Sequence, residues 1–237
     1  RQQNRMGPRW FQPLADVTKL MVKEEIVPAG VNATLFNLLP IFALAGPLTA
    51  ALYMPVGGIR PLLSFKGDLI VTVYLLSVLT IATGLAGANT ASRFSLLGAT
   101  RTLTQLFSYE APFMLALLGP AIAAGSWQIA EINDYAGNHL LLLREPIGFV
   151  IAIIGLAGKL ELPPFDAPEA ETEIVAGAMT EYGGRGLALF HLGRSAELVL
   201  GLTLIASFYL GGVASPLAYL LKTLALLLGL AGFQALM

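Results

Sequence analysis

Cysteine is absent from all 237 residues of the chain, and charged side chains make up only 12% of it. Without cysteine the chain can form neither disulfide bonds nor the thiolate ligand sets of zinc and iron–sulfur centres. The formal net charge is −1, and no basic run is interleaved with aromatic residues, so nothing points to a nucleic-acid partner. We therefore expect no cofactor and no metal in this chain, and any associated redox chemistry in a partner protein.

Apolar residues dominate what is present. They make up 56% of the chain, and the mean hydropathy of +0.72 indicates an integral membrane protein. Lipid offers the backbone no hydrogen-bond partner, so apolar runs of about 20 residues must be helices. We predict an all-α, polytopic transmembrane helical bundle in one membrane domain, 1–237. Its six expected spans are 33–54, 67–88, 105–125, 146–162, 186–210 and 216–236.

The Lys and Arg residues between these spans predict the orientation, because cytoplasmic connections carry an excess of both. Three such residues fall on one face, namely Arg60, Lys66 and Arg144. Nine fall on the other face, namely Arg1, Arg5, Arg9, Lys19, Lys23, Arg93, Arg101, Lys159 and Arg185. The face with nine should be cytoplasmic.

Ahead of the first span, FQPLADVTKLMVKEE places Leu14, Val17 and Met21 at helical spacing. This pattern predicts an amphipathic helix that lies in the membrane interface. The alternative is a surface helix that only anchors the loop.

Five carboxylates gather in ELPPFDAPEAETEIVAG, residues 161–177, namely Glu161, Asp166, Glu169, Glu171 and Glu173. One interpretation is structural, because Asp166 and Glu169 resemble a helix capping box. The other is functional. Residues 166, 169 and 173 would share a helical face, and crowded carboxylates raise one another's pKa until some hold protons near neutrality. This segment, which we call the acidic loop, lies on the predicted cytoplasmic face.

Ionisable side chains inside the predicted spans are functional candidates, because an unpaired charge there costs roughly 2.5–3.5 kcal/mol. Glu110 is one such candidate. The alternative is that its carboxylate reaches the membrane interface or is hydrogen-bonded to Ser108 or Tyr109. Arg194 and Glu197, three residues apart, could neutralise each other as a structural pair or form part of a proton path. We expect His191 to be a hydrogen-bonded bundle residue and His139 to lie in a loop.

Four blocks of the sequence resemble a known family in order and spacing. They are RMGPRWFQPLADVTKL, KEEIVPA, SLLGATRTLTQLFSYEAPFMLALLG and PPFDAPEAETEIVAGAMTEYGG. The family is the H subunit, or subunit 1, of respiratory complex I, which joins the membrane arm to the peripheral arm. Equivalent subunits occur in energy-converting NiFe hydrogenases and related archaeal sulfur-reducing complexes.

The resemblance implies one more helix before Arg1 and further residues after Met237. It also implies docking to a hydrogenase-like large subunit and an iron–sulfur small subunit that carry the NiFe centre and the clusters. Antiporter-like membrane subunits would lie beside it in a prokaryotic plasma membrane. Together with the patterns above, it predicts an ion pathway of Glu110, Asp166, Glu169, Glu171, Glu173, Glu181, Arg194 and Glu197. The predicted docking residues are Arg5, Arg9, Asp16, Lys19, Arg101 and Arg185.

Two departures favour the hydrogenase-type branch over the quinone-reducing one. The segment RMGPRWFQPLADVTK is several residues shorter than the complex I form, and LELPPFDAPEAE stands where complex I has ARTPFDLPEAE or NRTPFDLPEAE. The alternatives are a quinone-site subunit of complex I, a stand-alone ion-coupled transporter and a scaffold that only anchors the peripheral arm.

Overall fold

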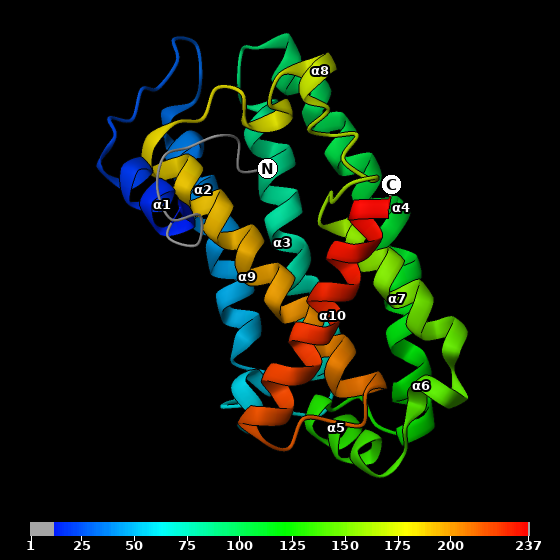
Figure 1. Ribbon diagram of the computed structural model, residues 1–237. Coiled ribbons are helices and arrows are strands. Elements are labelled where there is room, and N and C mark those ends of the chain that lie inside the picture. The colour runs from blue at the N-terminus through cyan, green and yellow to red at the C-terminus, as the bar shows by residue number, and fades with distance from the viewer. Residues whose placement is uncertain (1–11, 237) are drawn as a thin grey trace.

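The computed structural model describes residues 12–236, in which all regular structure is helical (Figure 1). Five helices of this part of the chain are long and apolar enough to cross a membrane. They are α2 (Ala33–Ala51), α3 (Asp68–Ala88), α4 (Arg93–Ala124), α9 (Gly184–Tyr209) and α10 (Pro216–Leu236). The prediction of a polytopic helical bundle is confirmed.

The sixth expected span, 146–162, is the shorter helix α7 (Pro146–Lys159). Its 14 residues cover about 21 Å, which is less than the roughly 30 Å of a hydrocarbon core. After Lys159 the amide of Glu161 donates to the Gly158 carbonyl and that of Leu162 donates to Ala157, which is the Schellman pattern of a helix end. The residue at its left-handed position is usually glycine but here is Glu161, with φ +52°.

The remaining helices are short and lie towards the two ends of the bundle in Figure 1. Towards the upper end lie α1 (Gln12–Val22), α8 (Glu171–Ile174) and the 3₁₀ turn Gly177–Met179. The lower end holds α5 (Ile129–Asn138), α6 (Leu141–Arg144) and the 3₁₀ turn Val56–Gly58. The segments between helices that correspond to the expected cytoplasmic connections are 23–32, 89–92 and 160–183 in the structure. They lie towards the upper end.

Helix α1 confirms the predicted helix near the N-terminus. Its Val17 and Met21 are half-buried, whereas Leu14 is 66% exposed, so only part of the predicted apolar stripe packs on the bundle. Whether this helix lies in the membrane interface stays a prediction.

Small residues let α4 approach its neighbours closely. A side chain at Gly98 would collide with the backbone of Gly177 and Ala178, and one at Gly158 would collide with the ring of Tyr109. The first contact explains why α4 begins at Arg93 and not near 105: its polar first turns are covered by the end of the acidic loop and by Ala178, which follows it. The second contact brings α7 tightly against α4.

Two apolar clusters form the core. One, between α2, α3 and α9, contains the stacked rings of Phe36 and Tyr182, with centroids 4.1 Å apart. The other reaches from α3 and α4 to α9 and α10 and contains Phe113 and Tyr209.

At the lower end a group of hydrogen bonds, which we call the end cluster, fixes the start of α5. Buried Asp68 accepts from the Ile129 amide at 2.7 Å and from the Ser64 hydroxyl at 3.2 Å, and Gln128 donates to Ser64 at 2.7 Å.

Candidate functional site

Four helices each bring one polar side chain to a common position inside the bundle, and we call these residues the inner cluster. They are Ser77 on α3, Glu110 on α4, Lys159 on α7 and Glu197 on α9. The Lys159 ammonium lies 3.9 Å from a carboxylate oxygen of Glu110 and 3.9 Å from one of Glu197. It donates to the Ser77 hydroxyl at 2.9 Å, and that hydroxyl donates to Glu110.

Burial makes these contacts strong. Only 1% of the Lys159 side chain and 1% of the Glu197 side chain is exposed, and 16% of Glu110 is exposed. Charges so far from water must be paired, because their hydration has been lost. Neither carboxylate oxygen of Glu197 has a hydrogen-bond partner among the described residues, so its charge is balanced by attraction over distance alone.

A second group, which we call the loop cluster, joins α9 to the acidic loop. Arg194 donates to Glu161 at 2.8 Å, to Glu169 and to the Leu160 carbonyl at 3.1 Å. The last bond caps the end of α7. One guanidinium therefore holds two carboxylates and a helix terminus together, as its fork of five donors allows.

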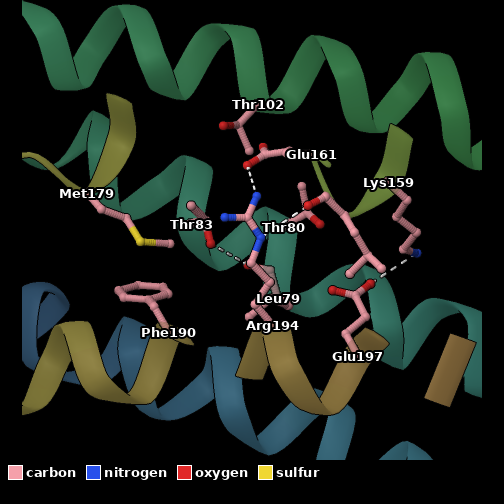
Figure 2. A pocket seen from close by; sticks show the side chains of 11 residues that line it. Leu79, Thr80, Thr83, Thr102, Lys159, Glu161, Met179, Phe190, Arg194 and Glu197 are labelled. Atoms are coloured by element: carbon pink, nitrogen blue, oxygen red, sulfur yellow. Dashed lines mark hydrogen bonds and ion pairs between the residues drawn. The ribbon is translucent and has the colours of Figure 1, made fainter. Parts of the chain in front are cut away.

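A cavity of about 20 Å³ separates the two clusters (Figure 2). Lys159 and Glu197 line it from the inner cluster, and Glu161 and Arg194 line it from the loop cluster. The apolar side is closed by Leu79, Leu160, Met179 and Phe190, and three threonines, Thr80, Thr83 and Thr102, complete the wall.

Each cluster holds two carboxylates and one cation. Fully ionised, each would carry one excess negative charge. Neighbouring carboxylates that share a site repel each other, and this repulsion is screened less in the inner cluster, because 41% of the Glu169 side chain in the loop cluster is exposed.

Glu161 lies outside the spanning helices, is buried and faces the Arg194 guanidinium. Burial raises the pKa of its carboxyl, the Arg194 charge lowers it, and the Glu169 charge raises it again, with a net upward shift from the ordinary value. Its left-handed backbone, φ +52°, is a conformation that costs a residue with a side chain roughly 1–3 kcal/mol. The chain bears this cost at the point where a carboxylate faces Arg194.

The structure brings together four of the predicted pathway residues, Glu110, Glu169, Arg194 and Glu197, but with unexpected partners. Arg194 and Glu197 do not form the ion pair considered from their spacing, because Arg194 turns to the acidic loop and Glu197 turns to Lys159.

The prediction of a shared helical face for residues 166, 169 and 173 is wrong. Residues 160–170 form turns around Pro163 and Pro164, and helix begins only at Glu171. The amides of Glu169 and Ala170 donate to the Asp166 backbone carbonyl, which makes a turn there and not a capping box. Half-buried Asp166 and Glu181 lie in these connections, and the side chain of Glu171 is outside the described atoms.

Glu173 lies at the surface, where Arg101 donates to it at 2.8 Å and to the Ala167 carbonyl at 3.2 Å. Of the other predicted docking residues, Asp16 and Lys19 lie on α1 and exposed Arg185 opens α9. Arg5 and Arg9 fall outside the described residues. The docking role of all six stays a prediction.

Sequence reasoning misses Lys159 and Ser77. The charge pattern assigns Lys159 to a connection, which is wrong: it is the last residue of α7 and is 3% exposed. The signal is available, since Lys159 falls inside the expected span 146–162, where an ionisable residue is a functional candidate. His139 directly follows α5, as expected of a loop residue, whereas His191 is exposed beside α1.

Comparison with known proteins gives a consistent result. A family model described as NADH dehydrogenase matches residues 1–237. The H subunit of NADH-quinone oxidoreductase from Carboxydothermus hydrogenoformans is 34% identical over 218 residues, which are 91% of this chain and 62% of that protein. The chain thus spans about three fifths of the length of this curated relative.

A solved structure of the membrane-bound sulfane sulfur reductase, described as an archaeal respiratory membrane complex, contains a chain of the same fold. The TM-score is 0.83 at 24% identity, and the match covers 99% of this chain and 80% of that chain.

Proposed function

Because this chain belongs to the NADH dehydrogenase family, we propose that it is the membrane subunit through which a respiratory-type complex couples electron transfer to ion translocation. The observation that carries the proposal is the position of Lys159, a buried ammonium 3.9 Å from carboxylates of two different helices. A change of charge at either carboxylate would alter the attraction between Lys159 and the other one. An ion pair with a purely structural role would not require this second carboxylate.

The coupling is electrostatic. When Glu110 takes up a proton, Lys159 loses one of its two counter-charges and is attracted more strongly to Glu197, which then holds its own proton less tightly. Because Coulomb energies are large where water is excluded, a proton gained at one carboxylate favours release at the other. The Ser77 hydroxyl, bonded to both Lys159 and Glu110, keeps these groups in contact.

The loop cluster would pass the redox event to the inner cluster. The acidic loop lies at the end of the bundle that we predict to be cytoplasmic, where Asp166, Glu169, Glu171, Glu173 and Glu181 would face a peripheral arm. Arg194 connects this loop to α9, which also carries Glu197. A change of charge in a docked partner would therefore reach the cavity wall through Glu169 and Arg194.

We assign the redox centres to partner subunits: a NiFe-type large subunit and an iron–sulfur small subunit, with antiporter-like subunits in the same membrane. The short N-terminal connection and the fold shared over 99% of the chain with the sulfur reductase subunit favour hydrogen evolution or sulfur reduction. The membrane would be the plasma membrane of a prokaryote, and the ion would be H⁺ or Na⁺.

Replacement of the two inner carboxylates tests the proposal. In the intact complex, Glu110→Gln and Glu197→Gln should each lower the number of ions moved per electron while the isolated redox half-reaction continues. Glu131→Gln, an exposed replacement on α5 at the other end of the bundle, is the matched control. Normal coupling in both inner variants would refute a role for the inner cluster.

The second candidate is a quinone-site subunit, favoured by the curated relative's name and by a groove of about 440 Å³ between α1 and α9. Purification of the complex separates the two, because the first candidate requires a NiFe-type large subunit or sulfur reduction and the second requires quinone reduction. A stand-alone carrier would instead move ions when this chain alone is placed in liposomes.

A further inference from the structure

A groove of about 210 Å³ lies at the lower end of the bundle, away from the inner cluster and the loop cluster. Three segments line it, namely the one between α2 and α3, helix α5, and the one between α9 and α10. All three lie at this end in Figure 1. A single water molecule needs on the order of 10–15 Å³ of such space, so the groove can hold a group of several atoms.

The backbone fixes the shape of this groove. The amide of Val213 donates to the side-chain oxygen of Asn133 at 2.7 Å, which joins α5 to the segment before α10. Gly58 has a φ of +75° and packs against the backbone of Ser215, where any side chain would collide. The groove is therefore formed before any ligand binds.

Two opposite charges line the groove without neutralising each other. Arg60 follows the 3₁₀ turn Val56–Gly58, and Asp134 lies on α5. Both are exposed, and neither forms an ion pair or a hydrogen bond within the described residues 12–236. An anion alone would be repelled by Asp134, and a cation alone would be repelled by Arg60. A ligand that carries an anion and a cation side by side suits both residues.

Exposed apolar side chains follow the groove residues along the chain. Leu62 comes two residues after Arg60, and Leu217 comes three residues after Ala214, which lines the groove. From Leu217 an exposed apolar face continues along α10 at helical spacing, with Leu221, Leu224 and Leu228. A polar group in the groove would therefore have an apolar surface beside it.

We propose that the groove binds the head group of a phospholipid that carries a primary amine beside its phosphate. The phosphate lies on Arg60, since a guanidinium matches phosphate oxygens with paired donors. The ammonium lies on Asp134, to which it offers three donors, and the acyl chains lie along the leucine face of α10. An anionic lipid without the amine would gain at Arg60 but lose at Asp134.

This assignment goes beyond the proposed function and does not depend on it. With the predicted orientation of the chain, the lipid belongs to the outer leaflet of the membrane. Its recognition would make the lower end of the bundle sensitive to the kind of lipid around it.

Four single replacements of exposed residues test the site. Arg60→Gln removes the partner of the phosphate, and Asp134→Asn removes the charge that faces the ammonium. Lys66→Gln and Glu131→Gln are the matched controls, because both residues are exposed at the same end of the bundle and neither lines the groove. None of the four residues is buried, so all four variants should assemble.

The first readout is lipid binding to the intact complex. The complex is depleted of lipid and titrated with dioleoylphosphatidylethanolamine or dioleoylphosphatidylglycerol, and bound lipid is counted by native mass spectrometry. The wild type should prefer the first lipid. Asp134→Asn should weaken binding of that lipid alone by about tenfold, as expected for the loss of one charge-assisted hydrogen bond. Arg60→Gln should weaken binding of both lipids.

The second readout is a density map of the complex in nanodiscs that contain the two lipids in equal amounts. Head-group density in the groove is expected for the wild type and both controls. A map that resolves lipids elsewhere around the bundle but shows the groove empty, or filled by a protein segment, would overturn the site. So would a wild-type lipid preference in Asp134→Asn, or a loss in Lys66→Gln as large as in Arg60→Gln. Normal coupling in the inner-carboxylate variants would refute only the proposed function.

Discussion

The inner cluster and the end cluster are both buried and polar, yet they are built on opposite principles. Asp68 accepts hydrogen bonds on both of its carboxylate oxygens, from Ile129 and from Ser64. Glu197 accepts none among the described residues and faces an ammonium at 3.9 Å. A fully bonded carboxylate fixes architecture, whereas we propose that a carboxylate held only by a distant charge takes part in coupling.

The largest effect should come from removing the cation of the inner cluster. Lys159→Met leaves two carboxylates of the bundle without their shared counter-charge, which should cost about 3–5 kcal/mol of stability. Thermal unfolding of the purified complex measures this. The double variant Lys159→Met with Glu197→Gln should recover much of the loss, and a double variant as unstable as the single one would contradict the pairing.

Breaking the end cluster should lower the stability of the complex by less than Lys159→Met does, and it should leave ion translocation intact. Asp68→Ala deprives the buried Ile129 amide of its acceptor, with an expected loss of about 1–3 kcal/mol. Asp68→Asn retains one acceptor oxygen and should lose less. Both variants should translocate ions normally once assembled. A coupling defect in Asp68→Asn would erase the functional contrast between the two clusters.

The pH dependence of stability should sharpen the contrast further. Burial raises the pKa of Glu161 above the ordinary 4.5, so the native state binds this proton more tightly than the unfolded state does. Its contribution is complete below pH 4.5 and declines as the pH rises through the raised native pKa, by at most about 1.4 kcal/mol per pH unit. Glu161→Gln should reduce the slope of the free energy of unfolding against pH in this range. An unchanged slope would contradict the raised pKa of Glu161.

The smallest effect should follow from the surface pair of Arg101 and Glu173. Their side chains are 34% and 61% exposed, and exposed pairs contribute about 0–1 kcal/mol. Arg101→Gln should therefore hardly change the unfolding temperature. Chemical cross-linking to peripheral subunits is the sensitive measurement, because a docking role predicts weaker attachment of the arm in this variant.

The apolar spans could be predicted from sequence because lipid dictates both their composition and their conformation. Helices α2, α3, α9 and α10 begin and end within a few residues of the expected limits. The start of α4 could not be predicted from the sequence, because its first turns are stabilised by contact with Gly177 and Ala178, which lie far along the chain.

Sequence reasoning singles out Glu110, Arg194 and Glu197, but it misses Lys159 and Ser77 and does not predict the arrangement of the candidate site. A carboxylate in an apolar run, such as Glu110, is conspicuous in any sequence. The contact between Ser77 and Lys159 joins residues 82 positions apart, and no local pattern encodes it. The spacing of Arg194 and Glu197 even pointed to the wrong partner, because proximity along one helix competes with stronger partners from other elements.

The close approach of Gly158 to Tyr109 has a consequence for the variation that related chains can tolerate. Any side chain at Gly158 would meet the Tyr109 ring, and a shift of α7 to avoid it would carry the adjacent Lys159 away from Ser77. Glycine at position 158 is therefore required to keep the side chain of Lys159 in its place beside Ser77. Across homologues, a larger residue there should occur only where the tyrosine has become smaller or where the buried lysine has been lost as well.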